Sequence, residues 1–407
     1  MSIRNPLQTN FMRLLHILFL SLLLISNNIY SQEKNKLKWK LKTDGRIYAT
    51  PAMDSESIYV GSEDHYFYAV DKSTGQIRWK FKTGGAVHSS ATLVDNTIVF
   101  GSSDGLLYAL DKKEGNLIWR FSSKGEKKYG LWDYYLSSPK SDENLIYWGS
   151  GDGNLYALDI KTGAKIWQFQ TDGIIHANPV IHDKKVFIGS FDGNLYALDK
   201  TTGELIWKFK TLGAQYFPKG EIQKAVLIDD GTVYFGSRDY NIYALDQNTG
   251  KVKWNMRETA GWIIATPTVK DDHIFFGTSD AHVFYALNKI SGATTWSFPV
   301  QMRVYGSAVV HKNVIYFGTF DGKLLGVDYK TGKQQWEFQT EGSKNNYQTV
   351  YNSEGKYKEG FHLYGQDMVE TENMILNLGA VLGDPVIEND VVYFGSADGS
   401  LYAVNLN

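Results

Sequence analysis

Residues 189–207 read GSFDGNLYALDKTTGELIW, and close copies of this phrase recur along almost the whole chain. In each copy, Asp-Gly and Thr-Gly pairs separate short apolar runs, as the turns of tight hairpins do. A repeat of about 40 to 45 residues that contains four short strands is typical of one blade of a β-propeller. The tryptophan that ends the phrase recurs at intervals of 40, 40, 48, 40, 47, 42 and 40 residues, at Trp39, Trp79, Trp119, Trp167, Trp207, Trp254, Trp296 and Trp336.

The two ends of the chain indicate how the ring closes. The unit around residues 177–209 predicts four strands, at Ala177–Ile181, Lys185–Gly189, Asn194–Leu198 and Glu204–Phe209. Lys38–Lys42 resembles an isolated fourth strand, whereas the last unit, Asp384–Asn405, stops after its third. We therefore expect an all-β, eight-bladed propeller of four-stranded antiparallel blades, in which the first strand completes the last blade.

Composition supports this fold class and excludes several functions. The 407 residues include 58 aromatic side chains and 39 Gly but only 8 Pro, which suits many strands joined by tight turns. The 42 Lys and Arg nearly balance the 44 Asp and Glu, and without a basic run the chain lacks the clustered cations of a nucleic-acid binder. The absence of Cys excludes disulfides, thiolate zinc sites, Fe–S clusters, thioether-linked haem and a lipid-modified cysteine.

The N-terminal segment has the pattern of a secretory signal peptide. Arg4 and Arg13 precede an apolar run at residues 14–25, which is short for a membrane span, and small and polar residues follow. We therefore expect residues 1–31 to be a signal peptide and residues 32–407 to be one propeller domain. The predicted protein is exported to the periplasm or secreted, without a lipid anchor or a membrane span, and is a monomer.

Length variation between blades falls in one type of connection. Insertions occur at residues 124–137, 212–223 and 341–383, each between the fourth strand of one blade and the first strand of the next. These connections share one face of a propeller, so the insertions should surround a single mouth of the central channel. Three long loops on one face favour a functional site there.

Alternation along the first strands predicts which side chains face that mouth. An apolar row should be buried between blades: Ile47, Val87, Ile175, Ile222, Ile263, Val304 and Val381. The residues on either side should be exposed at the mouth, and we single out Tyr48, His88, His176, Tyr305, Arg46, Arg303, Tyr134 and Trp262. The loops add Trp132, Tyr216 and Lys219. The eight Asp residues of the Asp-Gly type turns are expected to satisfy backbone donors rather than to bind calcium.

The phrase A-x-D-x-x-T-G-x-x-x-W resembles the tryptophan-docking motif of the quinoprotein-type propellers, which carry PQQ-like repeats. It is complete at Ala69–Trp79, Ala157–Trp167, Ala197–Trp207 and Ala244–Trp254, and degenerate copies start at Ala109, Ala286 and Gly326. The resemblance implies blade-to-blade packing and an eight-bladed ring. It implies no single function, because the same repeat occurs in quinone-dependent dehydrogenases and in a non-enzymatic outer-membrane assembly lipoprotein.

The mouth residues favour a polysaccharide lyase that binds a uronate-containing polymer and cleaves it by β-elimination. In site chemistry they resemble the propeller polysaccharide lyases. Arg46 and Arg303 would neutralise the carboxylate, and the base would be His88 or His176. Tyr48 or Tyr305 would be the acid. The other residues would bind the substrate: Trp132, Tyr134, Tyr216, Lys219 and Trp262.

Two other classes of function stay open. One is a non-enzymatic envelope scaffold whose partners are envelope proteins. The other is a quinone-dependent dehydrogenase, which the missing Cys pair and the shorter chain disfavour, so we do not expect pyrroloquinoline quinone. We predict no cofactor, although the turns leave room for a structural calcium ion, and the expected ligand is an anionic polysaccharide or oligosaccharide.

Overall fold

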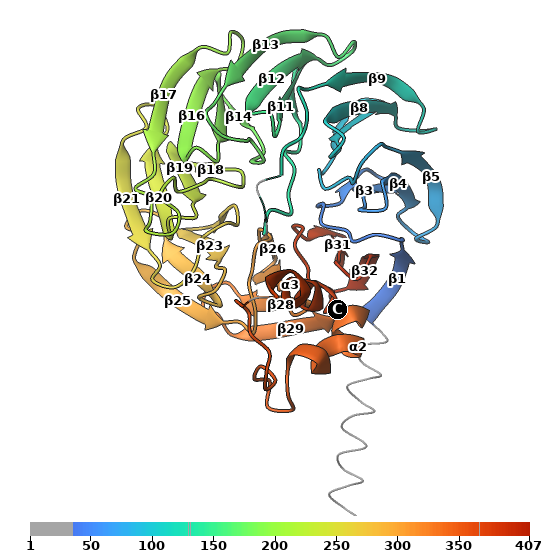
Figure 1. Ribbon diagram of the computed structural model, residues 1–407, viewed down its shortest axis with the longest axis vertical. Coiled ribbons are helices and arrows are strands. Elements are labelled where there is room, and N and C mark those ends of the chain that lie inside the picture. The colour runs from blue at the N-terminus through green and yellow to red at the C-terminus, as the bar shows by residue number, and fades with distance from the viewer. Residues whose placement is uncertain (1–35, 129, 131, 366) are drawn as a thin grey trace, which may run out of the picture.

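The computed structural model describes residues 36–128, 130, 132–365 and 367–407. Within these residues, eight four-stranded antiparallel sheets are arranged in a ring (Figure 1). The structure therefore confirms the predicted eight-bladed β-propeller. The predicted signal peptide, residues 1–31, lies outside the described residues. No helix in the described part of the chain is long and apolar enough to cross a membrane.

Each of the first four blades contains four consecutive strands. Blade 1 consists of β2 (Ala52–Met53), β3 (Ser57–Gly61), β4 (Tyr66–Asp71) and β5 (Ile77–Lys82). Blade 2 consists of β6 (Thr92–Val94), β7 (Thr97–Gly101), β8 (Leu106–Asp111) and β9 (Leu117–Ser122). Blade 3 consists of β10 (Lys140–Asp142), β11 (Leu145–Gly149), β12 (Asn154–Asp159) and β13 (Lys165–Gln170). Blade 4 consists of β14 (Val180–His182), β15 (Lys185–Gly189), β16 (Asn194–Asp199) and β17 (Leu205–Lys210).

The next three blades repeat this order, and the last one uses both ends of the chain. Blade 5 consists of β18 (Leu227–Asp229), β19 (Thr232–Gly236), β20 (Asn241–Asp246) and β21 (Val252–Arg257). Blade 6 consists of β22 (Thr268–Lys270), β23 (His273–Gly277), β24 (Val283–Asn288) and β25 (Thr294–Pro299). Blade 7 consists of β26 (Val309–His311), β27 (Val314–Gly318), β28 (Lys323–Asp328) and β29 (Gln334–Gln339). Blade 8 consists of β30 (Val386–Glu388), β31 (Val391–Gly395), β32 (Ser400–Asn405) and β1 (Leu37–Lys42).

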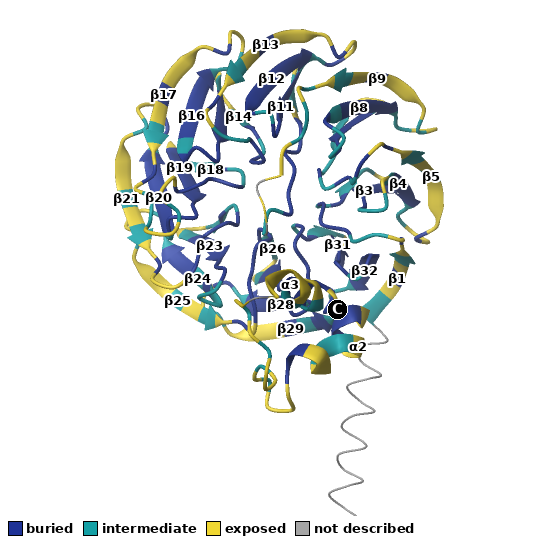
Figure 2. Cartoon of the chain, in the orientation of Figure 1, coloured by how far each residue is buried: buried dark blue, intermediate teal, exposed yellow. Residues whose placement is uncertain are grey.

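The ring closes as the sequence predicts. Strand β1 pairs antiparallel with β32, with Lys40 opposite Tyr402 and Lys42 opposite Ser400. The insertion between blades 7 and 8 carries two helices, α2 (Glu341–Val350) and α3 (Met368–Leu376). Figure 2 shows that the middle strands of the blades are buried, whereas the fourth strands form a largely exposed outer rim.

The first strands are shorter than predicted. The residues before them line the channel and form hydrogen bonds to the next blade instead of pairing within their own sheet. Strand β14 begins at Val180 rather than at Ala177. The small polar residues before these strands bond across to the next blade: the backbone N–H of Ser90 donates to Ser138 Oγ (2.9 Å), and that of Ser138 donates to Asn178 Oδ1 (2.7 Å). These bonds link neighbouring blades around the axis and satisfy backbone donors outside the sheets.

Seven of the eight docking tryptophans pack on a glycine turn of the following blade, and the exception is Trp336, which faces the blade that the two chain ends form. Trp207 Nε1 donates to the carbonyl oxygen of Gln247 (3.1 Å), and its ring faces Gly250 in the Thr-Gly turn. Gly250 has φ +69°, and a Cβ there would come within 2.7 Å of the Trp207 ring. A glycine is therefore required at this turn, which explains why Thr-Gly and Trp recur together.

The predicted apolar row is buried between blades, as expected. Ile222 is fully buried and packs against Gly189, where an added Cβ would approach Ile222 Cγ2 to 2.3 Å. Most of the turn Asp residues also behave as predicted. Asp192 accepts from the backbone N–H of Asn194 (2.8 Å) and from the Tyr196 hydroxyl (2.7 Å).

Two turn Asp residues differ, Asp280 and Asp321. In blade 6 the corresponding Tyr is shifted by one residue to Tyr285, whose hydroxyl donates to Glu258 instead, and in blade 7 it is replaced by Leu325. Asp321 is fully buried, and its carboxylate has no hydrogen bond among the described residues, so burial raises its pKa. Asp280 instead bonds to Arg303, at the mouth of the channel.

Candidate functional site

The loop insertions cover the mouth of the channel. Figure 1 shows the connection from β9 crossing the ring towards α3, which lies over the mouth. Trp132 Nε1 donates to Glu372 Oε2 in α3 (3.0 Å), and the Tyr134 hydroxyl donates to Glu372 Oε1. Residues 240 positions apart in the sequence thus meet above the axis. The prediction that insertions surround the mouth understated their role, because they also fill it.

Beneath this contact lies a cluster that we call the aromatic plug. Its members come from the segments before several first strands, from the 124–137 and 341–383 insertions, and from two turns between second and third strands. The plug consists of Tyr48, Tyr134, Tyr135, Trp262, Ile264, Met302, Tyr305, Phe320, Ile375, Leu376, Ala380, Leu382 and Ala397. Because these side chains pack on one another, the channel is closed by a small hydrophobic core on this face.

The plug corrects the expectation of an exposed mouth row. Tyr48, Tyr305, Trp262 and Arg303 are 2%, 1%, 6% and 1% exposed. Strand alternation correctly turned these side chains towards the axis, but α3 and the 124–137 loop fill that space and exclude water. Burial therefore raises the pKa of both the Tyr48 and the Tyr305 hydroxyls, which makes them weaker proton donors.

Arg303 is neutralised by two carboxylates rather than left open to a substrate. Its Nη1 donates to Glu372 Oε2 (3.0 Å), and its Nε donates to Asp280 Oδ1 (3.0 Å). Burial alone would lower the pKa of Arg303, but the neighbouring Tyr305, Glu372 and Asp280 raise it. The charge of Arg303 thus fastens α3 to blades 6 and 7.

His176 is held between two acids of the 124–137 loop. Its Nε2 lies 2.8 Å from Glu126 Oε1, and its Nδ1 lies 3.0 Å from Asp133 Oδ1. Burial opposes protonation, but the charges and hydrogen bonds of Asp133 and Glu126 outweigh it and raise the pKa of His176 to about 9. A protonated ring with both nitrogens engaged has no lone pair for a substrate proton, so His176 anchors the loop.

The contacts of His176 with Asp133 and Glu126 make the free energy of unfolding depend on pH. The folded-state pKa of about 9 lies above the ordinary value of 6.5. The stabilisation from His176 is therefore fully present below pH 6.5 and is lost as the pH rises through about 9. We expect His176→Gln to remove this alkaline loss in denaturant unfolding measured across that range. The control is His182→Gln, an exposed histidine, which should leave the profile unchanged.

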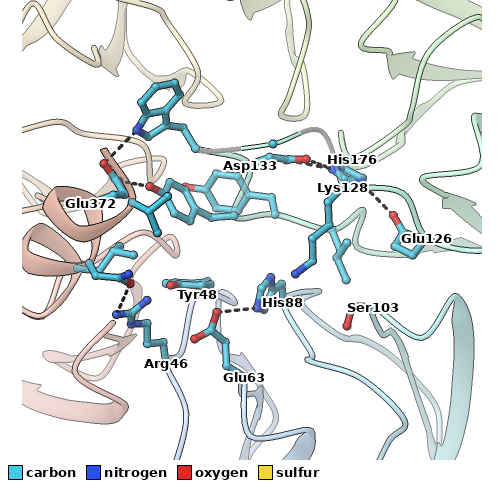
Figure 3. Close-up of a pocket in the computed structure, with 18 residues that line it drawn as sticks. Arg46, Tyr48, Glu63, His88, Ser103, Glu126, Lys128, Asp133, His176 and Glu372 are labelled. Atoms are coloured by element: carbon cyan, nitrogen blue, oxygen red, sulfur yellow. Dashed lines mark hydrogen bonds and ion pairs between the residues drawn. The ribbon is translucent and has the colours of Figure 1, made fainter. Parts of the chain in front are cut away.

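An open pocket remains beside the plug, with a volume of about 260 Å³ (Figure 3). It lies between blade 1, blade 2, the 124–137 loop and α3. Six of the predicted site residues line it: Arg46, Tyr48, His88, Trp132, Tyr134 and His176. Sequence analysis missed four charged side chains in it, which are Glu63, Glu126, Lys128 and Glu372. Three of these, Glu126, Lys128 and Glu372, lie in insertions that were themselves predicted to be functional.

The other predicted site residues lie elsewhere. Arg303, Tyr305 and Trp262 belong to the buried structure below the pocket. Tyr216 and Lys219 lie in the exposed 212–223 loop, and neither lines the pocket. The structure thus brings only part of the predicted set together.

The chain matches one family model, described as outer membrane protein assembly factor BamB, over residues 103–227 and 192–351. Together these matches cover more than half of the sequence. The chain belongs to this family. The match agrees with the repeats in the sequence and with the eight-bladed fold.

The solved and curated relatives are similar in fold and in short segments of sequence. BamB from Moraxella catarrhalis is 19% identical, with a TM-score of 0.66 over 91% of this chain and 97% of that one. Quinohemoprotein alcohol dehydrogenase from Comamonas testosteroni is 13% identical, with a TM-score of 0.69 over 92% and 77%. A lanthanide-dependent methanol dehydrogenase of Methylorubrum extorquens is 38% identical over 58 residues, which are 14% of this chain and only 10% of that relative.

The residues at the mouth do not fit the metal or quinone that two of these names imply. In the part of the chain that the structure describes, no group of three His, Asp or Glu side chains is placed to hold a metal ion. The space on the axis at this face, where a flat cofactor would need room, is filled by the aromatic plug. Glu372 and Asp280, the acids nearest the plug, already bind Arg303.

Proposed function

We propose that this protein is a non-catalytic binding propeller that acts as a scaffold in outer-membrane protein assembly. The observation that carries the proposal is the closed mouth of the channel. Most of the groups that would perform chemistry there are buried, whereas Leu212, Tyr216 and Val369 are exposed on the loops around them. A surface of that kind suits recognition of a protein partner.

The comparisons also support this proposal. The chain aligns with 97% of the BamB structure but with 77% of the quinohemoprotein dehydrogenase. The family that it matches is also described by a role in outer-membrane protein assembly.

The lyase hypothesis has less support from the geometry. It needs a free base, a free acid and an unpaired Arg around one sugar. His176 is protonated between two acids, Arg303 is neutralised, and the candidate acids Tyr48 and Tyr305 are buried. Of the predicted machinery, only Arg46 and His88 stand in the open pocket without such constraints.

A gene deletion and two assays distinguish the three classes of function, which are scaffold, polysaccharide lyase and quinone-dependent dehydrogenase. Under the proposal, deletion in the native host lowers the amount of assembled outer-membrane β-barrel proteins, and the wild-type gene restores it. The purified protein should form no unsaturated uronate from anionic polysaccharides. When it is supplied with alcohols and pyrroloquinoline quinone, the protein should also fail to reduce an electron-accepting dye. Product formation in either assay, or normal outer-membrane proteins after deletion, would contradict the scaffold role.

The exposed loop residues predict where the partner binds. Tyr216 is 76% exposed on the mouth face, beside Phe217, whose ring lies 4.6 Å from that of Trp262. Burying such an aromatic against a partner is worth about 2 kcal/mol when it is an interface anchor. We therefore expect Tyr216→Ala to weaken binding to the assembly machinery more than tenfold, measured by in-cell cross-linking and by titration. Ile290→Ala, an equally exposed residue on a turn at the opposite face, is the matched control and should have no effect.

A further inference from the structure

The pocket beside the plug presents two cations, Arg46 and Lys128, that form no salt bridge with a carboxylate among the described residues. Arg46 Nη2 donates to the neutral amides of Asn373 in α3 (3.0 Å) and of Asn377, the residue that follows α3 (3.1 Å). Lys128, on the 124–137 loop, has no ion-pair partner among the described residues. In Figure 3, the Lys128 side chain extends from the loop towards His88. Two cations that border a pocket without acid partners favour an anionic ligand.

Four carboxylates line the same pocket, and three of them are already bound, Glu126 and Asp133 to His176 and Glu372 to Arg303. The fourth, Glu63, lies beside an incompletely bonded histidine. His88 Nε2 lies 3.4 Å from Glu63 Oε1, which is long for a hydrogen bond, and it has no aligned partner among the described residues. Burial opposes ionisation of Glu63, but His88 and Arg46 outweigh it and lower the pKa of that carboxyl. A charged Glu63 accepts hydrogen bonds from hydroxyl groups and repels a ligand that carries two negative charges.

We propose that this pocket binds a sugar acid, as a single ring that carries one carboxylate and several hydroxyls. The carboxylate would lie between Arg46 and Lys128, where charge-assisted hydrogen bonds form, and the hydroxyls would donate to Glu63. The aromatic walls Trp132 and Tyr134 suit the apolar face of a sugar ring. A volume of about 260 Å³ suits a ligand the size of one sugar ring.

Calorimetric titration of the purified full chain tests this proposal, with D-galacturonate and D-glucuronate as the probes. We expect saturable binding, with a dissociation constant on the order of 1 mM or tighter for at least one of them. Galactose and glucose test the need for the carboxylate and should bind at least tenfold more weakly. Binding of neither acid, or equal binding of the neutral sugars, overturns the proposal.

Variants locate the ligand. Lys128→Gln should weaken sugar-acid binding at least tenfold, whereas Lys127→Gln, the exposed neighbouring residue, should leave it unchanged. Arg46→Gln should have a similar effect to Lys128→Gln, but it also touches α3, so a thermal melt must accompany it. Because Lys128 is exposed, its replacement leaves the fold intact, and unchanged binding by Lys128→Gln contradicts the site.

Two further ligands separate the sugar acid from other anions. Inorganic phosphate should bind poorly to the wild type because of Glu63, and Glu63→Gln should improve phosphate binding while weakening that of the sugar acid. The second of these ligands is a short peptide with a free C-terminal carboxylate. If phosphate or the peptide binds as tightly as the sugar acid and depends equally on Lys128, the proposed ligand class is wrong. The titrations contain no envelope partner, so their outcome is independent of the scaffold proposal.

Discussion

Replacing Glu372 by Ala is expected to lower the free energy of unfolding by about 3–5 kcal/mol. Glu372 is 6% exposed and accepts hydrogen bonds from Trp132, Tyr134 and Arg303. Its loss leaves these buried donors without their acceptor and removes half of the charge that balances Arg303. An uncompensated buried charge costs far more than the net value of a salt bridge.

Glu370 provides the matched control, because it lies on the same helix but is exposed. Glu370→Ala should change the free energy of unfolding by no more than about 0.5 kcal/mol. Urea unfolding measures both variants, and near-ultraviolet circular dichroism follows Trp132, whose ring should lose its fixed environment only when Glu372 is replaced. Equal stability of the two variants would mean that α3 does not fasten the plug.

The fold was predictable because its signals are local and repeated. Each Asp-Gly and Thr-Gly turn lies within a few residues of the strands that it joins, and each docking Trp occurs a fixed distance after its turn. Even ring closure, which joins β1 to β32, needed only a count of strands at the two ends. The exceptions also have a signal in the sequence, since one extra residue separates Asp280 from Tyr285, and Leu325 replaces the Tyr that partners the other turn Asp residues.

For the site, the sequence predicted only which side chains turn towards the channel axis. Alternation showed that Tyr48, Arg303 and Tyr305 turn towards the axis, but it contains no information on what occupies the axis. That depends on contacts between Trp132 and Glu372, which are 240 residues apart, and between irregular segments that have no strand register. For the same reason Lys128 and Glu126 were missed, although the loop that carries them was recognised as functional.

The docking tryptophans are expected to govern the stability of the ring itself. Trp207→Ala should lower the free energy of unfolding by about 3–5 kcal/mol, as large-to-small changes of buried aromatics do. The ring of Trp207 is 9% exposed, lies 5.8 Å from that of Phe187, and covers the Gly250 turn of the next blade. Its removal leaves a cavity between two blades and takes the donor from the Gln247 carbonyl oxygen.

Two comparisons by urea unfolding test the reason for this effect. Ile206→Ala changes the adjacent residue, which is 46% exposed on the same strand, and should cost no more than about 0.5 kcal/mol. Trp262→Ala should cost about 3–5 kcal/mol although Trp262 lies outside the docking motif, because the plug buries it. A small loss for Trp262 would mean that the mouth is open in solution, whereas a small loss for Trp207 would mean that strand pairing alone holds the blades together. The two tryptophans therefore probe separate cores, one between neighbouring blades and one across the axis.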